Sequence, residues 1–170
     1  MNDIQNFISN AGEGNYERIE YFLKYTDIDP SDDNNEAIRL ASRNGYSEVV
    51  KLLLSDSRVD PSDVDNEAIS SASQNGHYEV VKLLLNDSRV DPSDFNNQAI
   101  IYASMNGHYK VVKLLLSDSR VLDKYIDNGP IINAIHKKCQ NILIKFHKNL
   151  SHKNFQVKNM NKSNWPNFLL

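Results

Sequence analysis

Apolar residues recur along the chain in a fixed segment, VVKLLL. This segment occurs three times (49–54, 80–85 and 111–116). Its apolar side chains are too numerous for one short helix to bury against a single partner helix. The pattern therefore predicts a helix at about 47–55 in the first copy, with its remaining apolar surface covered by a neighbouring unit.

A shorter apolar group precedes each copy of this segment. In the first unit Ile38, Ala41 and Ser42 stand at i, i+3 and i+4, the spacing of one helix face, so we expect a first helix at about 36–43. Asn44-Gly45 ends it, because glycine readily takes the left-handed backbone of a helix end. Each unit is therefore predicted as two short helices joined by a turn.

Two independent markers fix the length of the unit at 31 residues. Asp-Pro pairs begin the units, and glycines follow the first helices, both at this spacing (Asp29-Pro30, Asp60-Pro61 and Asp91-Pro92; Gly14, Gly45, Gly76 and Gly107). A residue before proline is pushed into extended backbone, so we expect the repeated DPSD to form the turn between units. The pattern predicts an all-α solenoid of stacked helix-turn-helix repeats, joined by short extended or hairpin-like loops.

This register predicts one repeat domain, 1–150, followed by a tail, 151–170. Within the domain we expect an N-terminal cap, three full repeats and a degenerate C-terminal cap (1–28; 29–59, 60–90 and 91–121; 122–150). The N-terminal cap is polar or aromatic at three positions that we expect to be buried in the first full repeat (Arg18, Glu20 and Tyr21 in place of Val49, Lys51 and Leu52). The basic tail has no period, and either it folds back on the last helix or it is a disordered linear motif.

The repeated residues resemble those of ankyrin repeats. GYSEVVKLLL and GHYEVVKLLL, at 45–54 and 76–85, are similar to the second helix of that family, and EAIRLAS, EAISSAS and QAIIYAS stand where the family has Thr-Pro-Leu-His-x-Ala-Ala. The resemblance covers residues 1 to about 148. It implies a stack of helix pairs that binds other proteins and carries no catalytic site.

The first helix departs from the family pattern. Glu36, Ala37 and Arg39 occupy the positions of the family's Thr, Pro and His, so the hydrogen bonds made there between family repeats cannot exist in the same form. Each unit is also shorter than the family's repeat of about 33 residues, which leaves either a β-hairpin finger or a shortened turn between units. This short variant resembles the ankyrin arrays of large DNA viruses of amoebae and of some amoebae.

The charge of the chain is unevenly distributed. The formal net charge is −3 at pH 7. From residue 122 onward eight lysines face only Asp123 and Asp127, which makes that segment +6 and leaves −9 for residues 1–121. An acidic body with a basic end suggests that the two parts have different partners.

The longest apolar runs are far below the roughly 20 residues that cross a bilayer. The beginning of the chain lacks the basic-then-apolar order of a signal peptide, and the single Cys139 excludes an internal disulfide. We therefore expect an intracellular, cytoplasmic monomer without a membrane partner.

No group of residues in the sequence predicts catalysis. His77 and His108 begin second helices, where we expect a structural role, and His136, His147 and His152 lack the spacing of ligands on one helix face. The repeated DPSD lacks the glycine and the closing glutamate of a calcium-binding EF-hand loop. We therefore expect no enzyme activity, no small-molecule substrate, no cofactor and no metal site.

Differences between the repeats indicate where a partner binds. The differences concentrate in the turn and in first-helix positions that are three or four residues apart, which share one helix face. They predict a partner-binding strip along the concave side, charged at one end and apolar at the other (Asp33, Arg39, Leu40, Arg43, Val64, Ser70, Ser71, Gln74, Phe95, Ile101, Tyr102 and Met105). The alternative is that duplicated repeats have drifted, and that Phe95 and Tyr102 pack locally against the last unit.

Two functions agree with these patterns. The first is a non-catalytic module that binds a protein, whose identity the sequence does not give, through the concave face and the turns between repeats. The alternative is binding of nucleic acid or another anionic surface through the lysines of 122–162. Against this alternative, the segment has no arginine and the acidic body repels phosphate, so nucleic acid is not the expected partner.

Overall fold

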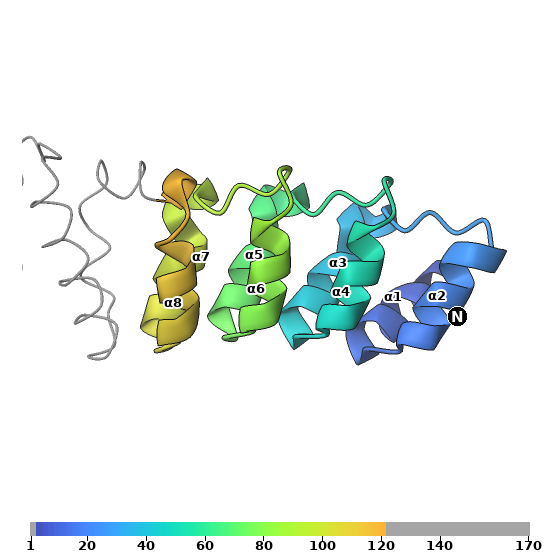
Figure 1. Ribbon diagram of the computed structural model, residues 1–170. Helices are drawn as coiled ribbons and strands as arrows, with labels where there is room; N and C mark the ends of the chain where they lie inside the picture. Colours follow the sequence, from blue (N-terminus) through green and yellow to red (C-terminus); the bar gives the residue numbers. More distant parts are fainter. Residues whose placement is uncertain (1–2, 122–170) are drawn as a thin grey trace, which may run out of the picture.

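The computed structural model of the protein describes residues 3–121. These residues contain no strand, and they include four consecutive helix pairs, with residues 119–121 also helical (α1 Asp3–Glu13 and α2 Tyr16–Tyr25; α3 Asp32–Asn44 and α4 Ser47–Leu54; α5 Asp63–Gln74 and α6 Tyr78–Leu85; α7 Asp94–Met105 and α8 Tyr109–Leu115). The pairs stand side by side, and the loops between them run along one edge (Figure 1). This is the predicted all-α solenoid of helix-turn-helix repeats. The predicted C-terminal cap, 122–150, and the tail, 151–170, lie outside the described residues.

The helices form two rows. The first row holds α1, α3, α5 and α7, and the second row holds α2, α4, α6 and α8 (Figure 1). Neighbouring helices of the first row contact each other more extensively than those of the second row do. The first row is therefore the more extensively packed side of the stack.

Small side chains explain the close spacing of the first row. In α3 the buried residues Ala37, Ile38, Ala41 and Ser42 face the interior. Alanine and serine let neighbouring backbones approach closely, and the same small positions return in α5 and α7. The narrow stripe predicted from the sequence is therefore the contact between repeats.

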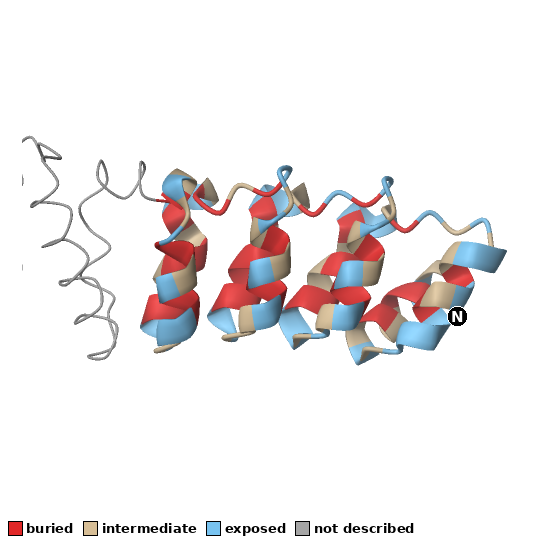
Figure 2. Cartoon of the chain, viewed as in Figure 1, coloured by how far each residue is buried: buried red, intermediate tan, exposed pale blue. Residues whose placement is uncertain are grey.

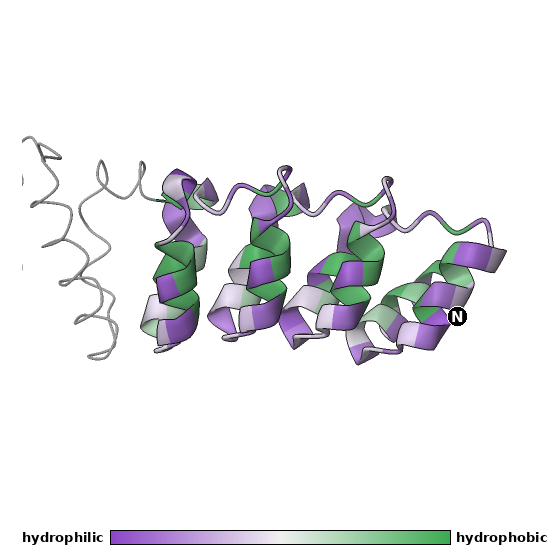
Figure 3. Ribbon diagram, in the orientation of Figure 1, coloured by the Kyte–Doolittle hydropathy of each residue, from purple (hydrophilic) through white to green (hydrophobic). Residues whose placement is uncertain are grey.

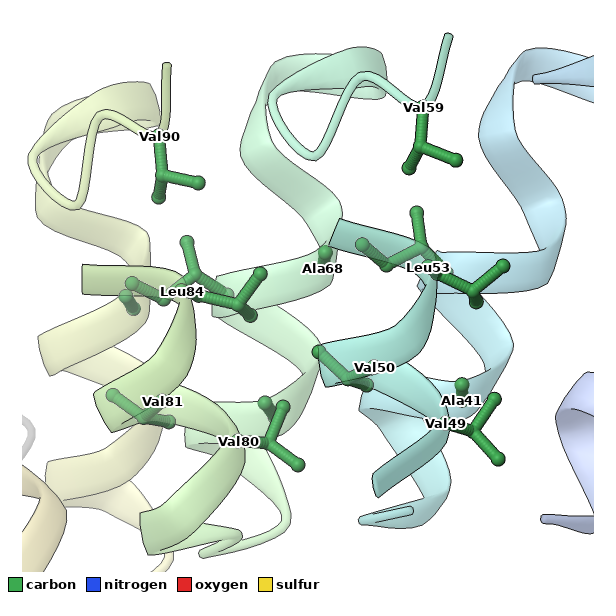
Figure 4. Packing of buried hydrophobic residues seen from close by; sticks show 14 of the residues in the cluster. Ala41, Val49, Val50, Leu53, Val59, Ala68, Val80, Val81, Leu84 and Val90 are labelled. Carbon is green, nitrogen blue, oxygen red and sulfur yellow. The ribbon is translucent and has the colours of Figure 1, made fainter. Parts of the chain in front are cut away.

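The second row supplies the larger apolar side chains. Val49, Val50 and Leu53 of α4 are at most 1% exposed, and their equivalents in α6 stack beside them (Figure 4). Burying each such side chain contributes about 1.5–3 kcal/mol. Buried and hydrophobic stretches coincide on the helix sides that face other helices (Figures 2 and 3).

The buried face of α4 is narrower than the sequence suggested. Lys51, expected to be buried, is exposed, and Leu52 is only partly buried. Successive residues of a helix are about 100° apart, so Lys51 lies about 200° around the helix from buried Val49 and points away from the core. The expectation for Lys51 was therefore wrong.

The connections between repeats are short turns, and no strand or hairpin forms within residues 3–121. In the second turn Asp60 accepts hydrogen bonds on Oδ1 from the backbone N–H and the hydroxyl of Ser62, at 2.9 and 2.6 Å. Pro61 beside them is buried. The repeated DPSD is thus a self-bonded turn, as aspartate and serine favour, and the shortened turn is the alternative that the structure adopts.

Each turn continues into three residues with left-handed backbone before the regular helix begins. They are Asp33–Asn35, Val64–Asn66 and Phe95–Asn97, with φ between 45° and 65°. The right-handed helix of the first full repeat therefore starts at Glu36, where the sequence predicted it. Left-handed backbone costs a non-glycine residue about 1–2 kcal/mol, and asparagine and aspartate tolerate it best.

The first helix pair lies at the N-terminal end of the described residues. The guanidinium of Arg18 lies 5.4 and 5.1 Å from the ring centroids of Tyr21 and Phe22, a cation–π arrangement. Tyr21 is 48% exposed, whereas Phe22 is 4% exposed. Among residues 3–121 no helix has the length and apolar content that crossing a membrane requires.

Candidate partner-binding surface

The residues of the predicted strip lie along the first row in two exposed rims and a less exposed middle. The turn rim holds Asp33, Val64 and Phe95, each the first residue of a left-handed turn. The far rim lies at the other end of the helices and holds the equivalent residues of the three repeats, all exposed (Arg43, Gln74 and Met105). The structure thus places the exposed non-repeating residues of the strip at both ends of each first helix.

The apolar residues of the turn rim are open to solvent. Val64 is 44% exposed and Phe95 is 60% exposed, whereas the equivalent residue of the first repeat, Asp33, is polar. Backbone N–H groups of Val64 and Phe95 donate to the preceding aspartates, Asp63 and Asp94, at 2.8 and 2.7 Å. These aspartates hold the turns, while the two apolar side chains stay exposed.

The middle of the strip is less accessible. Leu40 and Ile101 pack partly against the core, and Tyr102 is half-buried, its hydroxyl accepting a hydrogen bond of 3.1 Å from Gln98 Nε2. Ser70 and Ser71, also predicted as partner-binding residues, are only 6% and 8% exposed. They offer a partner little surface, so the rims carry the accessible part of the strip.

The two arginines of the strip are bound to one carboxylate. Arg39 Nη1 and Arg43 Nη2 both donate to Glu67 of the next repeat. Burial alone would raise the pKa of Glu67, but hydrogen bonds and charges from the two arginines hold its pKa below the usual value. Arg39 also donates to the carbonyl oxygen of Asn34 at 2.9 Å. Its side chain is therefore committed within the protein.

Glu67 was missed by sequence reasoning. It stands where the third repeat has Gln98, and it is opposite in charge to Arg39 and Arg43, the residues 28 and 24 positions earlier. That difference was the available signal. Its arginine partners lie in the preceding repeat and come close to it only because α3 packs beside α5.

Residues that repeat hold the stack together at the far ends of the first helices. His77 Nε2 lies 2.9 Å from the carbonyl oxygen of Arg43, and Asn75 Nδ2 donates to the same oxygen at 3.0 Å. His108 is placed in the same way, 2.9 Å from the carbonyl oxygen of Gln74. Both histidines thus have the structural role that the sequence suggested.

A second set of repeated residues ties each turn to the preceding one. Arg89 bonds both carboxylate oxygens of Asp87 and donates through Nη1 to the carbonyl oxygen of Val59, one repeat earlier. Arg58 and Arg120 make the same arrangement with Asp56 and Asp118. Sequence reasoning took this segment only for a stop and a turn.

The buried asparagines of the first two left-handed turns, Asn35 and Asn66, add further ties between repeats. Asn66 Oδ1 accepts the backbone N–H of Asp91, and its Nδ2 donates to Asp94 Oδ2, both at 2.8 Å. Asn35 bonds the equivalent Asp60 and Asp63, at 2.7 and 3.0 Å. The left-handed turn is what points these amides into the next repeat.

The described residues offer no arrangement for metal chemistry. Within residues 3–121 no three histidine, cysteine, aspartate or glutamate side chains are grouped so that they could hold an ion. Cys139, the histidines at 136, 147 and 152, and the lysines of 122–162 lie outside this range.

Comparison with known families agrees with this architecture. A model of ankyrin repeats in three copies matches residues 57–126, and a model of a single ankyrin repeat matches residues 33–66. Together they span residues 33–126, more than half of the 170-residue chain. No curated protein matches the chain. With its helix pairs, repeat register and family matches in agreement, the chain belongs to the ankyrin-repeat family.

Proposed function

We propose that the protein is a non-catalytic module that binds another protein through the two rims of the first row. Ankyrin repeats generally mediate protein–protein interaction. The proposal adds the binding face, and it rests on the residues that differ between otherwise repeated units.

The conformation of Val64 and Phe95 is the observation that carries the proposal. Both side chains are exposed, and both residues have left-handed backbone, with φ of 51° and 45°. A β-branched or bulky residue is strained there, whereas the aspartate of the first repeat tolerates it. Neither residue regains this cost by burial, and strained, exposed residues of this kind concentrate at sites of function. A partner that covers the two side chains supplies the missing compensation.

The far rim supports the same face. Met105 is 56% exposed at the end of α7, and it replaces the arginine and glutamine of the other repeats. Most ties between repeats use residues that repeat, such as the turn aspartates and the arginines bound to them, and the non-repeating exception is the pairing of Arg39 and Arg43 with Glu67. Drift alone would not favour an apolar residue at both exposed ends of one helix.

The test compares partner recovery with folding. Phe95→Asn together with Met105→Ser removes both exposed apolar side chains of α7, and Tyr25→Ser removes one that is 72% exposed on α2. Proteins retained from the native cell by the full-length chain are identified by mass spectrometry, and melting temperatures are measured in parallel. We expect the double variant to melt no lower than wild type and to lose the partner that Tyr25→Ser retains. Retention by all three proteins would refute this face as the binding site.

Binding through the lysines of 122–162 is the competing function. The described part of the chain works against it, because residues 1–121 carry a formal charge of −9. A salt titration distinguishes protein binding from lysine-mediated binding. Binding to phosphate groups through lysines weakens steeply as salt is added, and it occurs with any polyanion. Salt-tolerant binding of one protein is the expected result.

A further inference from the structure

Charge is segregated between the two helix rows. The first-row helices carry nine acidic and two basic residues, whereas the second-row helices carry four acidic and six basic ones. The two basic residues of the first row are Arg39 and Arg43, and both are bound to Glu67. The first-row side of the described stack therefore presents negative charge and has no arginine or lysine free of a carboxylate partner.

Exposed acidic groups lie beside the exposed apolar ones. Asp65 is exposed directly after Val64 on the turn rim, and Asp32 and Asp33 are exposed at the same place in the preceding repeat. The lysines of the described part lie on the second row instead (Lys24, Lys51, Lys82, Lys110 and Lys113). A partner that approaches the first row thus meets carboxylates before it meets any unpaired cation.

The third repeat adds an apolar surface at one end of this acidic face. Along the outward side of α7, Phe95 and Met105 are exposed and Ile101 and Tyr102 are half-buried. Asp94 is the one charged residue of the helix. Exposed or half-buried apolar side chains thus lie along this helix, while its polar residues Asn97 and Ser104 are buried.

We propose that the strip takes a cationic segment of the partner protein, with an aromatic or aliphatic side chain seated on α7 and lysine or arginine side chains beside the carboxylates of α5 and α3. This inference rests on the proposed function and names the chemistry of its partner. Neighbouring helices are about 8–10 Å apart, so an extended segment of about six residues, at about 3.3 Å each, spans from Phe95 to Asp33. Complementary charge directs the encounter, and the buried apolar anchor supplies most of the affinity.

The experiment selects random displayed dodecapeptides on the full-length protein and, in parallel, on the Phe95→Asn, Met105→Ser variant. We expect enriched peptides with net positive charge and at least one aromatic or aliphatic residue, binding the double variant about 30-fold more weakly, as loss of a central anchor implies. A matched pair of charge reversals, Asp65→Lys on the first row and Glu48→Lys on the second, separates local from overall charge. Asp65→Lys should weaken binding about 10-fold, whereas Glu48→Lys should change it less than about 2-fold.

The other outcomes distinguish this inference from the proposed function. Acidic or neutral peptides that still depend on Phe95 and Met105 would overturn the cationic partner and leave the binding face standing. Equal effects of the two charge reversals would mean that cationic peptides are attracted only by the overall charge of the protein. That result would overturn the inference. Failure to enrich any peptide that depends on the strip would count against the binding face itself.

The chain's own basic tail is the remaining competitor for the strip. Trp165 is the single tryptophan of the chain, so its fluorescence reports on the tail in the full-length protein. We expect its emission without peptide to be the same in wild type and in the double variant. A red shift in the variant would mean that the tail occupies the strip, which would overturn the assignment to a separate partner.

Discussion

His108 Nε2 lies 2.9 Å from the carbonyl oxygen of Gln74, so a side chain of the third repeat closes the helix end of the second. The last carbonyls of a helix have no partner within it and need one from elsewhere. The imidazole ring reaches Gln74 by lying against Gly76, where a Cβ would be 2.5 Å from ring atom Nδ1. Glycine at this position therefore serves both the turn and the junction between repeats.

Replacing this glycine should weaken the junction. Gly76→Ala forces alanine to a φ of +77° and pushes the ring of His108 away, so we expect the free energy of unfolding to fall by about 2–3 kcal/mol. Urea denaturation followed by circular dichroism measures the change. Gly12→Ala, within α1, is the control, because its added Cβ would lie at an ordinary contact distance of 3.5 Å from Leu40 of α3. That control should raise the free energy of unfolding by about 0.5–1 kcal/mol; similar losses in both variants would contradict the role of the ring.

The turn aspartates should make stability depend on acid pH. Hydrogen bonds from Arg89 lower the pKa of Asp87 in the folded protein, and Arg58 and Arg120 do the same for Asp56 and Asp118. Because the folded-state pKa is the lower one, this stabilisation is present above the ordinary aspartate pKa of 3.8 and is lost as the pH falls through the folded value. We expect the free energy of unfolding to be level from pH 7 to about pH 5 and to decline below about pH 4.

Asp87→Asn isolates one of these pairs. Because Arg89 is partly exposed, we expect a loss of only about 0.5–1 kcal/mol at pH 7. The difference from wild type should shrink toward pH 3, where the wild-type carboxylate also becomes neutral. Asp65→Asn, at an exposed residue of a left-handed turn, should leave stability unchanged. Denaturant titrations at pH 7, 4 and 3 provide the comparison, and a difference that stays constant down to pH 3 would exclude the ion pair as its cause.

Replacing the buried serines of the first row should raise the free energy of unfolding. Ser42, Ser73 and Ser104 are 0% exposed, and their hydroxyls have no hydrogen-bond partner among the described residues. An unpartnered buried hydroxyl costs about 1–3 kcal/mol, and alanine also favours helix. We therefore expect Ser73→Ala to raise the free energy of unfolding by about 1 kcal/mol, seen by calorimetry as a melting temperature about 2–4 °C higher.

Ser70 provides the comparison on the same helix. Its hydroxyl donates to the carbonyl oxygen of Glu67 at 3.2 Å, so Ser70→Ala gives up a hydrogen bond and should gain little or nothing. An equal gain from both substitutions would assign the effect to helix propensity alone. A loss in Ser73→Ala would show that its hydroxyl has a partner in solution.

The sequence predicted the elements better than the contacts between them. Helix limits near 36–43 and 47–55 followed from apolar spacing and from the glycine after the first helix, and both are local properties. The roles of Glu67 and Arg89 depend on atoms about 30 residues away that meet only when repeats stack. Comparison of the repeats found exposed positions such as Phe95, but it also selected Ser70 and Ser71, because a buried position can differ between repeats when its neighbours differ too.

The left-handed turns give a reciprocal test of strain. Val64 holds φ of 51° with a β-branched side chain, whereas Asp33 holds the equivalent place in the first repeat at 53°. Val64→Asn removes the clash and should raise the free energy of unfolding by about 1 kcal/mol, and Asp33→Val should lower it by a similar amount. Chemical denaturation of the two variants and of the double exchange measures this, and the double exchange should lie near wild type because the turns are separate. A loss in Val64→Asn would mean that valine contributes packing which its exposure does not show. A gain in stability together with weaker partner binding would instead show that this position is kept apolar for the partner and at the expense of the fold.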